Sequence, residues 1–205
     1  MKRLLLGISG ASGAVYGIRM LEVLRTLPTV QTHLITTPAA RETIRLETGR
    51  EPREVDTLAD EVHRFGDIAA PPSSGSFRFD AMAVVPCSMR TLSAIAYSLS
   101  DNLLVRAADV ALKERRPLLL APRETPLHLG HLKAMVRVAE IGAIVAPPMP
   151  AFYHHPQSLE DIVDQTVNRL LDQLGIELAD DLFQRWRGGR IEARRGESAL
   201  ADDPD

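Results

Sequence analysis

Short apolar runs alternate along this chain with longer stretches in which apolar residues recur at helical spacing. Such alternation is typical of an α/β protein, in which helices cover both faces of a parallel sheet. We therefore predict an α/β fold with three layers, built on a doubly wound, mostly parallel sheet. The predicted strands are Arg3–Ile8, Gln31–Thr36, Ala81–Val85, Pro117–Ala121 and Ala143–Ala146.

The segments between these strands carry the helical pattern. The clearest helix follows the last strand, because Ser158 and Asp161 resemble a capping box and Gly175 follows the end of the apolar stripe. The predicted helices run from about Gly13 to Leu27, from near Ala39 through Ile44, from Asn102 to Arg115 and from Ser158 to Leu174.

The composition fits one soluble domain, with 45% hydrophobic and 25% charged residues in 205. We predict a single folded domain over residues 1–187 and a disordered polar tail over 188–205. The net charge of -3 gives no basic field for nucleic acid. No apolar segment is long enough for a signal peptide or a membrane span. Cys87 is the one cysteine, which excludes an internal disulfide and favours a cytoplasmic protein.

A glycine-rich turn, GISGASGAVYG at residues 7–17, follows the first strand. A turn of this kind exposes amide groups at a helix N-terminus, where an anion is favoured. The P-loop lysine and the G-x-G-x-x-G dinucleotide motif are both absent, and Thr36 and Thr37 stand where a dinucleotide fold carries an acid. The turn therefore favours a mononucleotide, with FMN the natural candidate. The alternative is that the glycines only allow the helix and strand to approach closely.

Polar residues follow each later strand, at the edge where the loops of a parallel sheet converge. Ser88, Met89, Arg90 and Thr91 form either a second ligand-binding turn or an ordinary helix cap. Arg123 and Glu124 form either a phosphate-binding cation beside a proton-transfer carboxylate or a solvated ion pair.

The turn after the fifth strand presents aromatic and imidazole side chains. Tyr153 is a candidate ligand contact, and Arg169 on the next helix is a candidate for the same pocket. His154 and His155 have no third ligand at suitable spacing, so we expect no metal there. Lys113, taken alone, is a helix-end cation. The segment APPSSGSFRFD at 70–80 is equally consistent with a surface connector and with an active-site flap.

Five ordered motifs carry a resemblance to a known family: GASGAVYG, PPSSGSF, PCSMRTLSAIA, RAADVALKERRPLLLAPRETPL and PPMPAFYHHPQSLEDIVD. Together they resemble the UbiX-type flavin prenyltransferases, over residues Lys2 to about Trp186. The resemblance implies a Rossmann-like, flavodoxin-like fold and a homododecamer. It implies metal-free transfer of the dimethylallyl group of dimethylallyl monophosphate to N5 and C6 of reduced FMN. The prenylated FMN serves UbiD-type decarboxylases.

The resemblance also implies roles for single residues. Proton transfer falls to Glu47 and Glu124, with Ser12 and Tyr153 as further catalytic candidates. The residues implied to hold FMN are Gly10, Ala11, Ser12, Thr37, Ser88, Met89, Arg90, Thr91, Arg106 and Arg123. The residues implied to bind the allyl phosphate are Lys113, Arg123, Tyr153 and Arg169, and Trp186 matches a tryptophan near the site.

Two other functions stay open at this point. FMN-dependent cysteine decarboxylases share the fold, but their Pro-Ala-Met-Asn motif is missing from this chain. A non-catalytic, FMN-binding accessory subunit of a decarboxylase is the second alternative.

Overall fold

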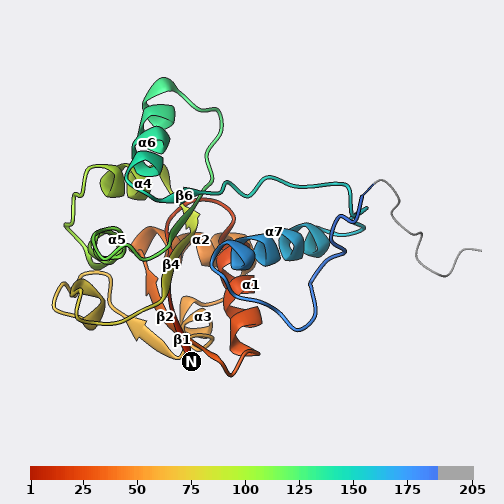
Figure 1. Cartoon of the computed structure of the whole chain (residues 1–205), viewed down its shortest axis with the longest axis horizontal. Helices are drawn as coiled ribbons and strands as arrows, with labels where there is room; N and C mark the ends of the chain where they lie inside the picture. Colours follow the sequence, from red (N-terminus) through yellow and green to blue (C-terminus); the bar gives the residue numbers. More distant parts are fainter. Residues whose placement is uncertain (189–205) are drawn as a thin grey trace, which may run out of the picture.

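A computed structural model describes residues 1–188 and contains one six-stranded sheet (Figure 1). All of its strand pairs are parallel, in the order β3-β2-β1-β4-β5-β6, which confirms the predicted doubly wound sheet. The strands are β1 (Lys2–Ile8), β2 (Val30–Thr36), β3 (Glu61–His63), β4 (Ala81–Cys87), β5 (Leu118–Pro122) and β6 (Ile144–Val145). The predicted tail, apart from Gly188, lies outside the described residues.

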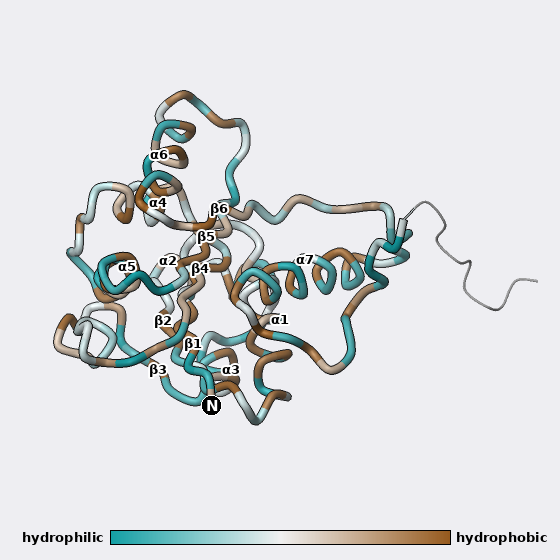
Figure 2. The backbone as a smooth tube through the Cα atoms, in the orientation of Figure 1, coloured by the Kyte–Doolittle hydropathy of each residue, from teal (hydrophilic) through white to brown (hydrophobic). Residues whose placement is uncertain are grey.

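Helices cover both faces of the sheet, and each face has its own hydrophobic core. One core joins the sheet to α1 (Ala14–Arg25), α2 (Pro38–Thr48), α3 (Pro52–Asp56) and α7 (Leu159–Gln173). The other joins it to α4 (Met89–Ala96), α5 (Leu103–Lys113) and α6 (Leu129–Glu140), with the short 3-10 turn η1 (Pro71–Ser73) against α5. Figure 2 shows the hydrophobic residues gathered along the central strands.

The alternation of side chains along β1 divides the two cores. Leu4, Leu6 and Ile8 enter the core under α1 and α7, whereas Leu5 enters the core under α4 and α5. This follows from the period of two in a strand, and it explains why a strand buried on both faces is apolar at every position. All seven residues of β4 are buried for the same reason.

The order of the strands reverses direction between β1 and β4. The chain fills the sheet outward from β1 to β3, and it then crosses back to place β4 on the other side of β1. In open parallel sheets, ligands bind beyond the carboxyl ends of the strands at such a switch point. A ligand site is therefore expected at the loops after β1 and β4. Among residues 1–188, no helix has both the length and the apolar character needed to cross a membrane.

Candidate active site

The glycines in and after the loop that follows β1 are required for different structural reasons. Gly13 has a φ of 99°, a left-handed conformation that other residues rarely adopt. A Cβ atom on Gly10 would lie 2.4 Å from Cβ of Ala39, and one on Gly17 would lie 2.3 Å from the carbonyl oxygen of Val85. Close approach of the backbone thus explains Gly10 and Gly17, as the alternative interpretation of the sequence proposed.

The buried Ser9 joins this loop to the loop after β4. Its hydroxyl donates to the carbonyl oxygen of Pro86 at 3.0 Å and accepts from the amide of Ser88 at 2.7 Å. Because both hydrogen-bonding directions of the hydroxyl are used within the protein, Ser9 holds the two loops together at the switch point. Ser12, the other serine of the glycine loop, is exposed.

Glu47, from the last turn of α2, lies at the N-terminus of α1. Its Oε2 accepts hydrogen bonds from the amides of Gly13 at 2.9 Å and Ala14 at 3.0 Å. Partial burial raises the pKa of Glu47, but hydrogen bonds from the Ser12 hydroxyl and these two amides outweigh it, so the pKa is lowered overall. Glu47 is therefore ionised at neutral pH and occupies the position at the start of α1 where an anion would otherwise bind.

The turn after β4 keeps backbone donors free. Ser88 caps α4, because its Oγ accepts from the amide of Thr91 at 3.2 Å, and its hydroxyl donates to Oγ1 of Thr91 at 3.1 Å. The amides of Met89 and Arg90 have no hydrogen-bond partner among residues 1–188. Two amides without a partner in this part of the chain, at a helix N-terminus and with the exposed Arg90 beside them, have the geometry of a phosphate cradle.

The threonines at the end of β2 contribute one unused hydroxyl. Thr37 caps α2, since its Oγ1 accepts from the amide of Ala40 at 3.0 Å. Oγ1 of Thr36 is buried and has no partner among the described residues. Buried hydroxyls are nearly always hydrogen-bonded, so Thr36 marks a place where a ligand or water completes the structure.

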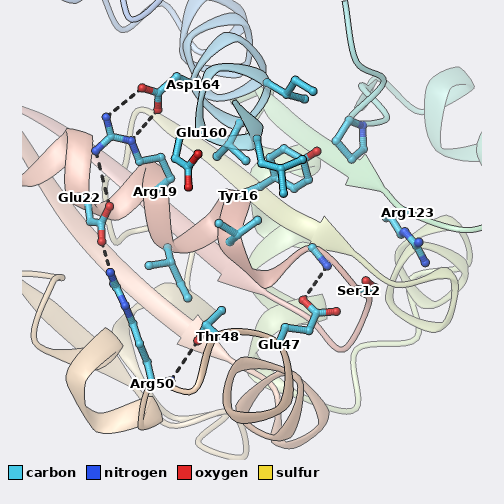
Figure 3. A pocket seen from close by; sticks show the side chains of 17 residues that line it. Ser12, Tyr16, Arg19, Glu22, Glu47, Thr48, Arg50, Arg123, Glu160 and Asp164 are labelled. Atoms are coloured by element: carbon cyan, nitrogen blue, oxygen red, sulfur yellow. Dashed lines mark hydrogen bonds and ion pairs between the residues drawn. The ribbon is translucent and has the colours of Figure 1, made fainter. Parts of the chain in front are cut away.

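A cavity of about 940 Å³ opens beside the glycine loop, between α1, the end of α2 and the start of α7 (Figure 3). Its volume is in the range of small-molecule sites. Ser12, Glu47 and Arg123 line one part of it, and apolar residues of α1 and α7 line another. Tyr16 also lines the cavity, where burial raises the pKa of its phenol and the nearby Arg123 guanidinium opposes that rise.

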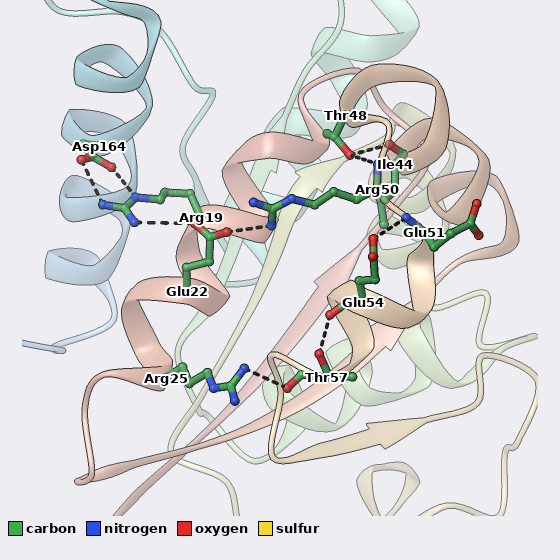
Figure 4. A network of polar contacts seen from close by, with 10 residues as sticks. All are labelled: Arg19, Glu22, Arg25, Ile44, Thr48, Arg50, Glu51, Glu54, Thr57 and Asp164. Atoms are coloured by element: carbon green, nitrogen blue, oxygen red, sulfur yellow. Dashed lines mark hydrogen bonds and ion pairs between the residues drawn. The ribbon is translucent and has the colours of Figure 1, made fainter.

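Four other charged residues of this cavity are held in ion pairs (Figure 4). Nε of Arg19 donates to Asp164 at 2.6 Å, and NH1 of Arg50 donates to Glu22 at 2.7 Å. Arg123, in contrast, has no ion pair within the described part of the chain. It is consequently the cavity's arginine that is available to an anionic ligand.

Three of the cations named from the sequence lie elsewhere in the single chain. Arg106 donates to the carbonyl oxygen of Ser73 at 3.0 Å and to Asp109 at 2.9 Å, which places it against the 70–80 segment. Nζ of Lys113 lies 2.5 Å from Oε1 of Glu114. Neither side chain lines the cavity with Arg123. Arg169 lines a second cavity of about 320 Å³ against β6.

Tyr153 and Trp186 form an aromatic cluster with Phe183. The ring centroids of Tyr153 lie 6.5 Å from Phe183 and 5.8 Å from Trp186. Beside them, Asp172 binds NH1 of Arg169 at 2.7 Å and both NH groups of Arg185. The hydrogen bonds from Arg185 lower the pKa of Asp172, and its partial burial raises it. The Arg185 contribution is the larger, so the pKa is lowered overall. Tyr153 and Arg169 thus both connect to the segment after α7, Tyr153 through its aromatic contacts and Arg169 through Asp172, and neither lines the cavity of Ser12.

Cys87 and Glu124 both lie outside the lining of the main cavity. Cys87 is fully buried, and burial raises the pKa of its thiol, so it acts as a core residue. Glu124 is exposed, and its Oε1 accepts from the amide of Thr125 at 3.0 Å. It follows Arg123 directly but does not line the cavity.

The 70–80 segment is held by Arg116, whose guanidinium donates to the carbonyl oxygens of Gly75 and Phe77.

The switch-point cavity, the phosphate cradle and the doubly wound sheet define a flavoprotein-type α/β protein, and residues 1–171 match the family described as Flavoprotein. The chain is 61% identical over 188 residues to the flavin prenyltransferase UbiX of Escherichia coli K12, covering 92% of this chain and 100% of that protein. It is 52% identical to UbiX of Thauera aromatica, with 91% and 94% covered. The chain belongs to this flavoprotein family, among the UbiX flavin prenyltransferases.

Solved structures agree with this placement. A UbiX structure in complex with FMN and dimethylallyl pyrophosphate is 49% identical, with a TM-score of 0.88 over 92% of this chain and 99% of that one. A dodecameric, FMN-dependent UbiX-like decarboxylase of Escherichia coli O157:H7 is 48% identical, with a TM-score of 0.88 over 91% of this chain and 100% of that one. The cysteine decarboxylase TvaF, at 17% identity and a TM-score of 0.61 over 85% of this chain and 99% of that one, shares the fold alone.

Proposed function

We propose that this protein is a flavin prenyltransferase, which joins the dimethylallyl group of dimethylallyl monophosphate to N5 and C6 of reduced FMN. The observation that carries the proposal is the cavity at the switch point. There Arg123, which forms no ion pair within residues 1–188, lies with Ser12 and the ionised Glu47, and the first amides of α4 lie beside the same loop. The site therefore combines anion binding with a carboxylate, as transfer from an allyl phosphate requires.

FMN fits the donor groups that these loops leave unused. We propose that its phosphate is held by the amides of Met89 and Arg90 with the hydroxyls of Ser88 and Thr91. Gly10, Ala11 and Ser12 would hold the flavin from the β1 side, Thr37 from β2 and Arg123 from β5. The partnerless hydroxyl of Thr36 supports this fit, because a polar ligand at the end of β2 would complete its hydrogen bonding.

The allyl phosphate needs more cations than one chain brings together. Arg123 lines the main cavity, whereas Lys113, Tyr153 and Arg169 lie outside it. We propose that neighbouring copies complete each site, and that the assembly is a dodecamer like the related structure. Arg106 then acts from α5, where its hydrogen bond to the carbonyl oxygen of Ser73 holds the 70–80 segment beside it.

The roles of the residues follow from the bonds that change. When bound, reduced FMN supplies the nucleophilic N5 and C6 positions. The C–O bond of the allyl phosphate breaks and the phosphate leaves with the electron pair, so Lys113, Arg123 and Arg169 would stabilise the leaving group. Tyr153 would donate a proton to it as the first bond forms at N5, which loses its own proton. Ring closure at C6 then breaks the C=C bond of the attached prenyl group, so the other alkene carbon gains a proton while C6 loses one. A carboxylate, Glu124 or Glu47 acting with Ser12, would accept the proton lost from C6. No metal is needed for these steps.

The test is to mix the protein anaerobically with reduced FMN and dimethylallyl monophosphate and to determine the mass of the extracted flavin. We expect a flavin heavier by one prenyl unit in the wild type and in the surface control Arg137→Ala. Arg123→Ala and Arg169→Ala should lose the product. Tightly bound but unmodified FMN would instead favour the accessory-subunit function. Supplying dimethylallyl pyrophosphate in parallel determines which phosphate is used.

The domain organisation, the compartment and the recipient of the product are also proposed, from the sequence and from the relatives. Residues 1–187 would fold as one domain in the cytoplasm, as the single cysteine suggests. The product would be delivered to a UbiD-type decarboxylase.

A further inference from the structure

Three side chains with metal-binding atoms converge at the edge of the sheet, away from the glycine loop. In the parallel register, His33 of β2 pairs with Glu61 of β3, and Ile35 pairs with His63. Residues 61 and 63 share one face of β3, and the register places His33 on the same face. The fold therefore brings two imidazoles and one carboxylate together without a loop.

The atoms of this cluster are close enough to share one ligand. Nδ1 of His33 lies 2.9 Å from Nε2 of His63 and 3.4 Å from Oε2 of Glu61. The three ligand atoms all lie within 4.8 Å of one another. Nδ1 of His33 carries at most one proton, so it cannot donate well to both His63 and Glu61. A cation placed among the three atoms would instead contact all of them.

The surroundings differ on the two sides of the cluster. The His33 side chain is 1% exposed and its Nε2 has no partner among residues 1–188, whereas the Glu61 side chain is 51% exposed. The buried side fixes the ligands, and the exposed side gives an ion a path from solvent.

The charges that face the cluster favour a cation on balance. Asp60 and Asp67 lie near the histidines, while Arg3 is the opposing cation. The Arg3 guanidinium is occupied elsewhere, since it lies 4.9 Å above the Phe77 ring and donates to the carbonyl oxygen of Arg78 at 2.6 Å.

We propose that His33, Glu61 and His63 bind one zinc ion, which links the edge strand β3 to β2. Two imidazole nitrogens and one carboxylate oxygen are a ligand set that zinc prefers and that magnesium and calcium do not. Water would complete the tetrahedral coordination on the exposed side. This site is independent of the proposed prenyl transfer.

The predicted affinity is modest for a physical reason. Metal binding through Nδ1 requires His33 to carry its proton on Nε2, where the buried surroundings offer no acceptor. A missing outer-shell partner weakens zinc sites by about 10- to 100-fold. We therefore expect a dissociation constant in the micromolar range.

The consequence of binding would be structural. Phe77 lies edge-on to His33 with ring centroids 5.3 Å apart, so the ion would support β3 together with the 70–80 segment. Zinc should accordingly raise the thermal unfolding temperature of the protein.

The test measures zinc binding to chelator-stripped full-length protein by competition with a chromophoric chelator. His63→Ala and Glu61→Gln are the test variants, because both positions lie on the edge strand. His128→Ala/His131→Ala is the matched control, since it removes another close histidine pair, with ring centroids 3.6 Å apart. Circular dichroism checks that each variant is folded.

We expect one equivalent of zinc in the wild type and the control, at least tenfold weaker binding in both test variants, and a zinc-dependent rise of Tm in the wild type and control. Cobalt should give the intense visible bands of tetrahedral coordination. Wild-type affinity retained in Glu61→Gln and His63→Ala, loss of binding in the control, or no binding by the wild type would each overturn the proposal. FMN binding is measured separately, so failure here leaves the proposed function intact.

Discussion

Glu47 shows how one side chain can organise the start of a ligand site. Its carboxylate satisfies the amides of Gly13 and Ala14, two donors that the first turn of α1 leaves unpaired. It therefore acts for α1 as an N-cap that arrives from another helix. The same carboxylate faces Ser12 and the Arg123 charge. Glu47 therefore both stabilises the start of α1 and belongs to the candidate active site.

We predict that Glu47→Gln destabilises the protein by about 0.5–1 kcal/mol, as loss of an exposed capping interaction typically does. The pKa of Glu47 is lower in the folded protein, so its contribution is present above the unfolded value of about 4.3 and is lost as the pH falls through the folded value. Urea unfolding from pH 7 to pH 3 measures this. The difference between wild type and variant should stay constant down to about pH 5 and shrink below about pH 4.

Glu177→Gln is the matched control, because Glu177 is exposed and makes no hydrogen bond or ion pair within the described residues. It should leave the unfolding midpoint unchanged throughout this range. An equal shift in both variants would show that Glu47 acts only through the net charge of the protein.

Strands that are buried on both faces were predicted from the sequence. The short edge strand β3 and the largely exposed helix α6 were not. The apolar runs of β1 and β4 follow from burial against two layers, and their positions agree with the predicted strands. β3 has only three residues and exposes Val62, so it carries no apolar run. α6 was missed because it buries only Ala134 and Val138 and exposes Leu129 and Leu132.

Helix α7 organises the second group of candidate residues through Asp172. The Asp172 carboxylate binds Arg169 on its own helix and Arg185 of the following segment, and Arg185 also binds Asp181. These contacts, together with the hydrogen bond from the amide of Leu182 to Asn168, hold residues 181–186 against α7. The helix thus keeps Trp186 beside Tyr153.

We predict that Asp172→Asn loosens this segment and frees Arg169 from its partner. Hydrogen exchange in residues 181–188 should accelerate several-fold, and the KM for dimethylallyl monophosphate should change more than kcat, because the positioning of a phosphate-binding cation changes. Asp180→Asn is the control, since Asp180 is exposed and has no ion pair among residues 1–188. Unchanged exchange would contradict the proposed positioning role.

The places of the candidate residues in the fold explain why the sequence alone could not predict which of them share one cavity. Ser12, Glu47 and Arg123 meet because the carboxyl ends of β1 and β5 and the end of α2 share one edge of the sheet. Lys113 ends α5, and Arg169 lies within α7, and neither lines this cavity. Spacing along a chain indicates which loops converge within one subunit, but it contains no rule for contacts between copies.

The exposed apolar face of α6 indicates where copies could meet. Leu129, Leu132 and Val136 recur at helical spacing and are 65%, 46% and 57% exposed, respectively. A stripe of this kind on a helix favours burial against a partner. This agrees with the proposed assembly, in which residues from different copies complete the site.

We predict that two inactive variants restore each other's activity when they form mixed assemblies. Arg123→Ala removes the cation of the main cavity, and Arg169→Ala removes the cation of the second cavity against β6, so each variant alone should lack prenyl transfer. If a site takes these residues from different copies, a mixed assembly contains some sites with both arginines intact. The measurement is prenylated FMN from the two variants, co-expressed with different affinity tags and purified through both tags.

The control joins Arg123→Ala and Arg169→Ala in one chain and co-expresses that double variant with itself, which should give no product. Activity in the mixed assembly and none in the control would locate each site between copies. A mixed assembly that is intact but inactive would instead mean that both arginines act from the same chain. The segment carrying Arg169 would then have to move toward Arg123 when the allyl phosphate binds, and hydrogen exchange with and without that substrate would reveal this motion.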